Sequence, residues 1–261
     1  MFPSFKVWYI RLSLLVHLKQ FSTVEVEAEA FGDLDRVDLY YEYYSRMETN
    51  NQESSTSKYG SIVPFGLRLL LAELPQYLGK HNEAIDRLHH ILAIVDKILL
   101  NLNNKKLENG QNPSSSELND LETSKQLWKR RKIKVLFTIS NCAVLQKDFE
   151  LSIMTLEMIF DISEEIEEKI NIRSSIGRVF LQLGDVNVAS NCFENSKILR
   201  NQLMASCPKE VYNKLKVEEL IGKLIHICNI AFFVLGVGSS KNVKTQIGSI
   251  CIKAPTNWNW S

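Results

Sequence analysis

The sequence predicts an all-α fold, an α-solenoid of tetratricopeptide-like helical hairpins. Three short stretches indicate this fold, because each one ends an apolar helical pattern and begins the next. In each stretch a small residue follows the turn residue by five positions. These pairs are Gly79 and Ala84, Lys147 and Ser152, and Gly184 and Ala189. The shared spacing indicates repeated hairpins, which bury one another and leave a face for partner proteins.

Composition and charge agree with a helical protein. The 261 residues include 11 Gly and 6 Pro, and 45% of them are hydrophobic and 23% charged. A net charge of +1 gives no overall attraction to polyanions, so nucleic acid is not a predicted partner. The five cysteines are scattered without a CxxC pair, which predicts neither a disulfide framework nor a zinc site.

The first predicted element is a helical hairpin over residues 1–30. Trp8 stands sixteen residues before Val24, the distance between the bulky residue that starts a repeat and the small residue of its second helix. The N-terminus lacks a small-residue cleavage site and predicts no secretory signal. The longest apolar run, residues 227–238, is shorter than the roughly 20 residues of a membrane span. We therefore expect a cytoplasmic protein with no direct membrane span.

Residues 31–63 are predicted to be a polar loop or linker that carries a tyrosine cluster. Asp, Ser, Thr and Asn are frequent there, as is typical of loops. Two interpretations of the tyrosines are open: they pack on the solenoid, or they contact a partner protein. The candidate partner-binding tyrosines are Tyr40, Tyr41, Tyr43 and Tyr44.

The main block of repeats is predicted over residues 64–200, with a polar insert at 101–123. The two helices of each hairpin should cross closely at residues twelve positions apart, where small side chains let the backbones approach. These pairs are Ala72 with Ala84, Ser140 with Ser152, Gly177 with Ala189 and, with bulkier side chains, Leu12 with Val24. Sixteen positions before the last three small residues stand Arg68, Leu136 and Arg173, of which only Leu136 fits the bulky pattern.

The last unit of this block is the most complete. Its first helix is expected to bury an apolar stripe at spacings of three and four, made of Ile176, Val179, Phe180 and Leu183. Gly184 is placed to end that helix in the left-handed backbone region, where glycine has no steric penalty. Asp185 is then placed to cap the following helix.

The repeat pattern is incomplete after residue 200. Residues 201–235 are predicted to form part of a further repeat, with an apolar first helix from about residue 214 to 235. The sequence then shows no small residue where the second helix is due. Residues 236–261 are therefore predicted to be an atypical, disordered tail.

No residue pattern predicts catalysis, a cofactor or a metal site. His81, His89 and His90 form no HExxH motif, and the glycines near residue 237 lack the spacing of a phosphate-binding loop. The strongest local charge feature is WKRRKIK at residues 128–134. One interpretation is a solvated helix face with Ile133, Leu136 and Phe137 turned inward. The other is a basic patch for nuclear import or for an acidic partner.

Several stretches together resemble a known family. They are WYIRLSLL (8–15), FG (31–32), DLYYEYY (38–44), VPF (63–65), Arg68, AEL (72–74), QYLG (76–79), LH (88–89), SIGR (175–178) and LQLGD (181–185). From about residue 7 to about residue 236 the chain is similar to the tetratricopeptide region of the trafficking protein particle (TRAPP) complex subunit 12 family. The tyrosine stretch is the most specific part, since generic repeats have no reason to contain it.

The resemblance implies a non-catalytic scaffold subunit of a vesicle-tethering complex in endoplasmic reticulum-to-Golgi transport. Its partners would be the other subunits, and it would be peripheral at those membranes through its complex. Members of the family carry a long N-terminal extension and further C-terminal repeats, so the chain is expected to be truncated at both ends. The alternative is a generic tetratricopeptide adaptor that grips a short peptide or chaperone tail, with Asn141 and Arg178 in its groove.

Overall fold

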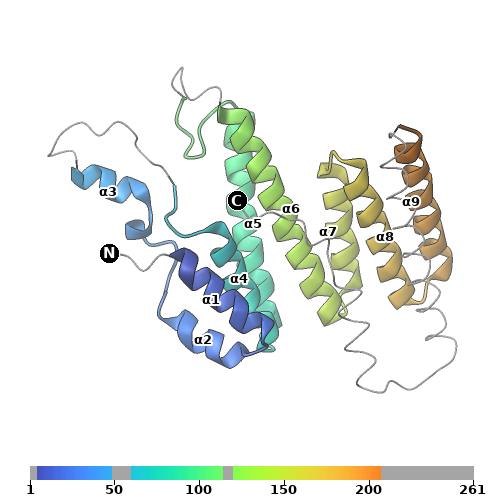
Figure 1. Ribbon diagram of the computed structural model, residues 1–261, viewed down its shortest axis with the longest axis horizontal. Coiled ribbons are helices and arrows are strands. Elements are labelled where there is room, and N and C mark those ends of the chain that lie inside the picture. Colours follow the sequence, from blue (N-terminus) through green and yellow to red (C-terminus); the bar gives the residue numbers. More distant parts are fainter. Residues whose placement is uncertain (1–4, 49–59, 114–119, 207–261) are drawn as a thin grey trace. The chain divides into compact units, whose positions relative to one another are not determined.

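The computed structural model describes residues 5–48, 60–113 and 120–206, and these residues are almost entirely helical (Figure 1). Their elements are α1 (Phe5–His17), α2 (Phe21–Glu29), the 3-10 turn η1 (Val37–Leu39), α3 (Tyr41–Glu48), α4 (Phe65–Tyr77), α5 (His81–Asn103), α6 (Leu121–Gln146), α7 (Phe149–Ile162), α8 (Ile166–Leu183) and α9 (Val186–Ser206). The chain divides into two compact units, residues 1–200 and 201–261, and the packing below is that of the first. The predicted all-α solenoid is confirmed.

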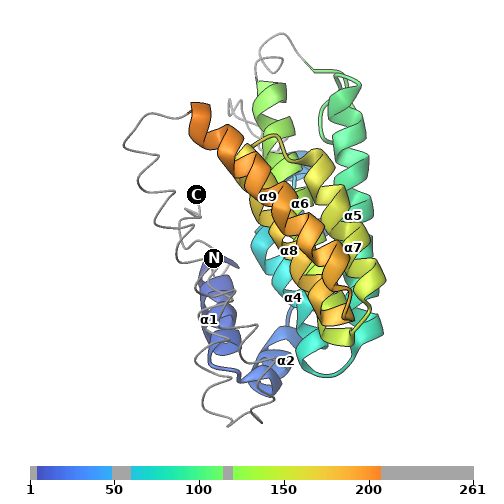
Figure 2. The ribbon, with the colours of Figure 1, turned by 90° about the vertical axis from the view of Figure 1, so that its right-hand side faces the viewer.

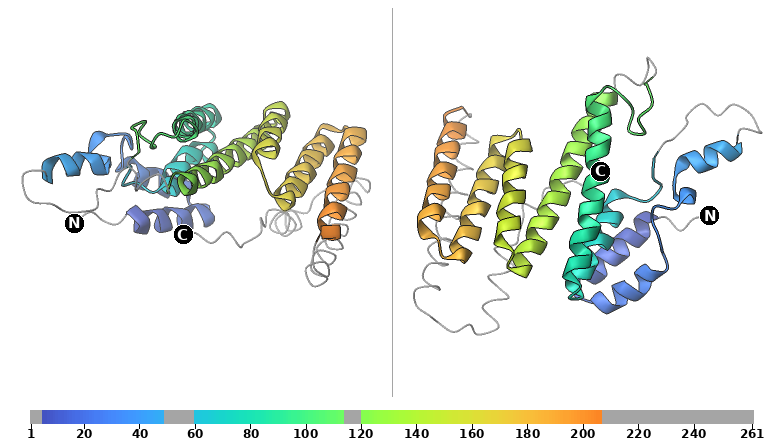
Figure 3. Two further views of the ribbon diagram at one scale, coloured as in Figure 1. Left: turned by 90° about the horizontal axis from the view of Figure 1, so that it is seen from above. Right: turned by 180° about the vertical axis from the view of Figure 1, so that it is seen from behind.

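Consecutive helices pack against one another along the chain. Helix α4 contacts α5, α5 contacts α6, α6 contacts α7, and α7 contacts α8. The back view shows this order side by side (Figure 3, right), and Figure 2 shows the same helices from the end. Seen from above, α5 and α7 lie in one layer and α4, α6 and α8 in the other (Figure 3, left). Because each helix touches its chain neighbours, the solenoid grows by adding hairpins.

The turns between paired helices share one backbone geometry, which the sequence analysis predicted at Gly184. Gly79, Lys147 and Gly184 all adopt the left-handed backbone region, with φ of 80°, 64° and 84°. The residue after each of the last two turns caps the next helix: Asp148 Oδ1 accepts a hydrogen bond from Leu151 N at 3.1 Å. These local signals explain why the chain reverses at these three points.

The paired helices touch most closely at the small residues. Ser140 Oγ and Ser152 Oγ are 2.8 Å apart and hydrogen-bonded within the core. At Gly177 an added Cβ would lie 2.9 Å from the ring of Phe193, so only glycine fits without displacing that ring. The small residues of the predicted pairs are all buried: Ala72, Ala84, Ser140, Ser152, Gly177 and Ala189. Small side chains at these positions therefore set the distance between the helices.

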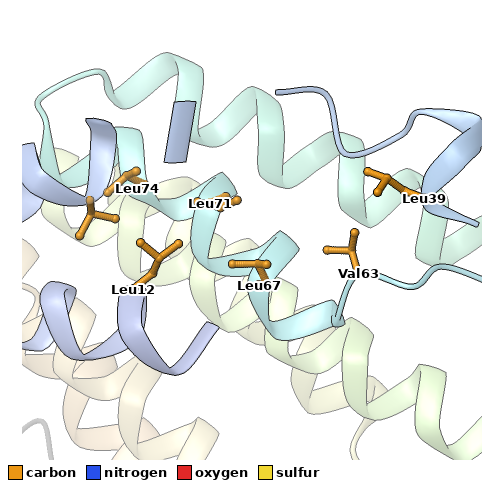
Figure 4. Close-up of a cluster of buried hydrophobic side chains, with 7 residues drawn as sticks. Leu12, Leu39, Val63, Leu67, Leu71 and Leu74 are labelled. Carbon is orange, nitrogen blue, oxygen red and sulfur yellow. The ribbon is translucent and has the colours of Figure 1, made fainter. Parts of the chain in front are cut away.

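The first hairpin shares a hydrophobic core with the segment that follows it (Figure 4). The core consists of Leu12, Val24, Leu39, Val63, Leu67, Leu71 and Leu74. These residues come from α1, α2, η1, α4 and Val63, two positions before α4. Trp8 packs edge-on against Phe31, with 5.5 Å between the ring centroids. The segment between the first hairpin and α4 is thus anchored to the solenoid by buried apolar side chains.

The expected loop over residues 31–63 needs correction, because it contains η1 and the two-turn helix α3. The polar composition of this region predicts a loop, but Leu39 is buried in the core. Residues 41–48 contain neither Gly nor Pro, so nothing in them interrupts a helix. The polar insert at 101–123 is also shorter than expected, since α5 continues to Asn103 and α6 begins at Leu121. Residues 201–206 continue α9, and the other residues of the expected repeat and tail, 207–261, lie outside the described part.

Two side chains that were expected to point inward are exposed. Phe137 is 36% exposed, because it follows the buried Leu136 and adjacent residues of a helix point about 100° apart. Leu183 is 49% exposed, because it is the last residue of α8 and lies at the edge of the contact with α9. The predictions for Ile176 and Val179 are confirmed, and Phe180 is half-buried against the same core.

Candidate protein-interaction site

The tyrosine segment, which carries Tyr40, Tyr41, Tyr43 and Tyr44, is closed at its base by hydrogen bonds between residues 39–42 and residues 60–62. Tyr41 N donates to Gly60 O at 3.0 Å, and Ile62 N donates to Leu39 O at 2.9 Å. Gly60 N in turn donates to the carboxylate of Glu42 at 2.8 Å. The two ends of the segment are therefore held together where it leaves and rejoins the helices.

The guanidinium group of Arg68 on α4 binds the residues on both sides of this segment. Its Nη2 donates to Leu34 O at 2.7 Å and to Ser61 Oγ at 3.0 Å, and its Nη1 donates to the carboxylate of Asp35. The guanidinium also lies 5.9 Å from the centroid of the Tyr40 ring. Arg68 fits the bulky repeat pattern poorly because its side chain serves this segment instead. We call these contacts the Arg68 staple.

The Arg68 staple helps to lower the pKa of the Asp35 carboxyl group. Partial burial raises the pKa of Asp35, but hydrogen bonds and charges from Arg68 and then His90 outweigh it and leave the pKa below its ordinary value. His90 Nε2 on α5 lies 3.4 Å from Asp35 Oδ2. The carboxylate thus joins the segment to two helices of the solenoid and stays ionised at neutral pH.

All four candidate tyrosines are half-buried. Tyr40 packs against Arg68, and Tyr43 and Tyr44 meet edge-on with 5.3 Å between their ring centroids. Tyr40 therefore packs on α4, whereas Tyr43 and Tyr44 pack on each other, and part of each of the four side chains stays exposed. Contact between these exposed parts and a partner remains a prediction.

Asn141 and Arg178 lie on other helices, α6 and α8, and the structure does not bring them together with the tyrosines in one site. Each stands one position after a small crossing residue, Ser140 or Gly177, so the two occupy equivalent places in successive hairpins. Both are exposed, and Arg178 Nη2 donates to Ser175 Oγ at 2.7 Å. A groove function for these two residues remains a prediction.

A further surface on α6 was missed by the sequence reasoning. Six exposed residues follow one line of the helix at spacings of three and four: Leu127, Arg130, Lys134, Phe137, Asn141 and Leu145. At 3.6 residues per turn they fall within an arc of about 80°. We call this line the α6 stripe. A count of the same spacing from Asn141 could have found it, but the expectation that Phe137 was buried concealed it.

The basic run at residues 128–134 is divided between internal contacts and the α6 stripe. Lys129 pairs with Glu164, and Lys132 pairs with Asp96 at 2.8 Å. Arg131 lies over the buried ring of Trp128, 4.2 Å from its centroid. Arg130 and Lys134 are exposed and stand on the α6 stripe.

The electrostatic environment of Lys134 is positive. The pKa of Lys134 is lowered first by partial burial and then by the charges of Arg131 and Arg130. Among the described residues, no carboxylate lies within ion-pair distance of Arg130. Additional negative charge placed near these side chains would therefore be stabilised.

A buried polar cluster between α4 and α6 lacks the properties of a catalytic site. The hydroxyl of Tyr77 donates to Glu73 Oε1, and burial raises the pKa of Glu73 although this hydrogen bond lowers it. Burial, and then the charge of Glu73, raise the pKa of Cys142 to about 12. A thiol that stays protonated is a poor nucleophile.

Other signs of chemistry are weak in the described part of the chain. The pocket lined by residues 79–83 is a shallow, open depression of about 370 Å³ at the turn between α4 and α5. Within residues 5–48, 60–113 and 120–206 no cluster of His, Cys, Asp and Glu side chains could hold a metal ion. Across the same residues no helix has the length and apolar character needed to cross a bilayer.

Comparison with known proteins identifies the relatives of the chain. It is 35% identical over 254 residues, 97% of its length, to trafficking protein particle complex subunit 12 of Mus musculus. It is 36% identical over 233 residues, 89% of its length, to the Homo sapiens protein of that name. The predicted resemblance is confirmed. The aligned region covers 97% of the chain and therefore spans both the tyrosine segment and helix α6.

The chain spans less than a third of the length of these relatives, 29% of the mouse subunit 12 and 28% of the human one. No protein-family model matches the chain. No solved structure matches it either. The similarity to subunit 12 therefore rests on sequence, and the helical hairpins described above supply its structural context.

Proposed function

We propose that this chain is a non-catalytic scaffold subunit of a vesicle-tethering complex in endoplasmic reticulum-to-Golgi transport. It acts by binding the other subunits of that complex, in the cytoplasm and at the surface of those membranes. The observation that carries the proposal is the similarity of nearly the whole chain to subunit 12 of the trafficking protein particle complex. A solenoid of helical hairpins fits this role, because such folds present extended surfaces to partner proteins.

The tyrosine segment is the first candidate surface for this assembly. Its rings are presented by a short helix that Arg68 and buried Leu39 hold in place. A segment that is ordered before binding loses less conformational entropy when the complex forms. Tyrosines bring apolar area and a hydroxyl to such contacts. The exposed parts of Tyr41, Tyr43 and Tyr44 are therefore proposed to meet another subunit.

Affinity purification from cytosol followed by mass spectrometry tests the proposal. We expect the tagged full chain to recover subunits of the tethering complex. A variant with Tyr43→Ser and Tyr44→Ser should recover less of them while keeping the helical content of the wild type. Recovery of chaperones alone would instead support the peptide-binding adaptor, in which Asn141 and Arg178 contact the chaperone tail.

A further inference from the structure

We propose that the exposed face of α1 binds an amphipathic helix of a partner protein, with acidic residues along the borders of its apolar stripe. The inference rests on the proposed function for the source of that helix, which would be another subunit of the complex. The contact would repeat the packing of one hairpin on the next within the solenoid. We call this face the α1 stripe, and it consists of Val7, Ile10, Leu14 and Leu18.

The α1 stripe is a continuous line of exposed apolar side chains. The exposed fractions are 64%, 59%, 58% and 67% for Val7, Ile10, Leu14 and Leu18. Spacings of three and four place them within an arc of about 80° at 3.6 residues per turn. Leu18 directly follows α1, and its N–H still donates to Leu14 O at 2.9 Å. The opposite face of α1 is buried through Leu12, so the stripe is a second apolar face.

The position of Val7 is buried in each of the later hairpins. Val7 stands five residues before Leu12, the residue at which the two helices of its hairpin cross. The residues at the same distance before the crossing residues of α4, α6 and α8 are Leu67, Val135 and Ile172. Each of them is at most 1% exposed and packs in a core with residues of the preceding hairpin. Val7 therefore occupies a position that contacts the preceding hairpin wherever the described solenoid contains one.

The position of Leu14 shows the same difference. Leu14 stands two residues after Leu12. Its counterparts on α4, α6 and α8 are Leu74, Cys142 and Val179, and all three are buried in the same three cores. In the described part of the chain no hairpin precedes α1. The α1 stripe thus continues the series of hairpin interfaces, and an amphipathic helix is the element that packs at such positions.

Ion pairs between successive hairpins predict the charge of the bound helix. At each of the three junctions a cation of the later hairpin meets an acid on the second helix of the earlier one. These pairs are Lys80 with Glu25 at 2.7 Å, Lys132 with Asp96 at 2.8 Å and Arg173 with Glu157 at 3.6 Å. Residues 5–19 carry the cations Lys6, Arg11 and Lys19 and no acid. Since Arg11 pairs with Glu27, acids on the partner helix would meet the exposed Lys6 and Lys19 at the two ends of the stripe.

An acidic helix fits this face better than a membrane or a second copy of α1. The three cations are balanced by Glu25, Glu27 and Glu29 on α2, so the first hairpin has no net charge to attract anionic lipids. Two copies of α1 would place cations against cations, because α1 contains no acid. A helix with a leucine stripe bordered by glutamates matches both the apolar and the charged positions.

Fluorescence anisotropy with synthetic peptides tests the proposal on the full chain. The first probe is an amphipathic helical peptide with Leu at every third or fourth position and Glu on both borders of that stripe. The second has the same composition in an order that leaves its leucines on no common face, and the third has Lys in place of Glu. We expect the second to bind about tenfold more weakly than the first, and the third about fivefold more weakly. Equal binding by either control peptide would overturn the proposal.

Matched variants locate the site. Ile10→Ala with Leu14→Ala should weaken binding of the first peptide about tenfold or more, because it removes apolar contact area from the middle of the stripe. Leu100→Ala with Met154→Ala acts on similarly exposed side chains of α5 and α7, 61% and 55%, and should have less than about a twofold effect. Alanine is the best helix former, so circular dichroism should show unchanged helical content in both variants. A similar loss of binding in both would refute the assignment to the α1 stripe.

Charge reversal supplies an independent check. Lys6→Glu with Lys19→Glu should reverse the preference, so that the Lys peptide binds more tightly than the Glu peptide. An unchanged preference for the Glu peptide would overturn the proposed position of the acids.

Two further measurements test the other occupants. Light scattering detects a dimer of the full chain, and sedimentation with phosphatidylserine vesicles detects binding to lipid. Dimerisation or vesicle binding that is lost in Ile10→Ala with Leu14→Ala would assign the stripe to a second copy or to a membrane and overturn the proposal. Equal behaviour of the wild type and this variant in both measurements would support it.

The two alanine variants also distinguish the inference from the proposed function. Loss of the tethering-complex subunits from the Ile10 and Leu14 variant alone would support both. Equal recovery by the wild type and both variants would leave the scaffold function intact and overturn this inference. If even the wild type recovers no subunit, the scaffold function fails, and the peptide titrations still decide whether the α1 stripe binds acidic amphipathic helices.

Discussion

Removing the Arg68 staple with Arg68→Ala should release the tyrosine segment while the solenoid stays folded. The Arg68 side chain is only 16% exposed, and it holds Leu34 O, Ser61 Oγ and the carboxylate of Asp35. In Arg68→Ala, Leu34 O and Ser61 Oγ lose this donor, and water can take its place. The hydrophobic cores of the later hairpins contain none of these atoms.

The size of the effect follows from the kind of contact. Partly buried hydrogen bonds to a charged group contribute about 1.5–3 kcal/mol, and the half-exposed ion pair with Asp35 about 0–1 kcal/mol. Because one side chain makes all three contacts, their contributions are not additive. We expect local opening of the segment to become easier by about 2–4 kcal/mol, which is roughly a 30- to 700-fold change in the opening equilibrium.

Hydrogen–deuterium exchange measures this opening at two amides. Tyr41 N and Ile62 N are hydrogen-bonded across the base of the segment, so both should exchange faster in Arg68→Ala. Ser152 N in α7 should keep its protection. Arg36→Ala is the matched control, because the pair of Arg36 with Asp38 spans 3.4 Å and both side chains are about half-exposed. It should change exchange at Tyr41 and Ile62 by less than about twofold.

Two results would refute this reasoning. Unchanged exchange at Tyr41 and Ile62 in Arg68→Ala would show that buried Leu39 alone holds the segment. Equal loss of protection in Ser152 would show that the staple supports the whole solenoid rather than one segment. Arg68→Lys adds a further check, since lysine keeps the charge but lacks the planar fork that reaches three acceptors. We expect it to behave more like alanine than like arginine.

Three further predictions concern stability. Gly177→Val should lower the free energy of unfolding by about 1–3 kcal/mol, measured by chemical denaturation, because its Cβ would lie 2.9 Å from the Phe193 ring; an unchanged midpoint would mean that the ring moves freely. Lys147→Gly should raise stability by about 0.5–1 kcal/mol at φ 64°, and a loss of stability would contradict the assigned turn. Since the pKa of Glu73 is raised in the folded protein, its ionisation disfavours folding as pH rises through that pKa. Glu73→Gln should therefore raise the melting temperature at pH 7 more than at pH 4, and an equal shift at both values would exclude the ionisation as the cause.

The hairpins could be predicted because their determinants are local. Left-handed turn residues and small crossing residues recur at fixed spacings, and each acts within one hairpin. Ser140 and Ser152 illustrate this, since a spacing of twelve already places them face to face. The order of the helices follows from the same repeats, because elements that are consecutive in sequence usually pack as neighbours, here even across residues 104–120 between α5 and α6.

The tyrosine segment and the α6 stripe could not be predicted in the same way. The position of the tyrosine segment depends on burial of Leu39 in the core and on the contacts of Arg68 with Leu34 and Ser61, which only the tertiary fold brings together. The stripe depends on which face of α6 is buried, and the sequence of α6 offers apolar residues on both faces. Phe137 was therefore assigned to the core, whereas Leu136 and Ile139 already fill it.

The pairwise succession of helices has a consequence for how this protein responds to damage. Helix α8 shares a core with α6 and α7, whereas α1 shares its core with α2 and α4. A loss of stability in one hairpin affects a distant hairpin only through the hairpins that lie between them. A substitution near residue 177 should therefore leave the packing around residue 12 intact. Thermal unfolding should therefore occur in stages. A destabilising substitution in one hairpin should remove the contact surface of that hairpin before it affects the next one.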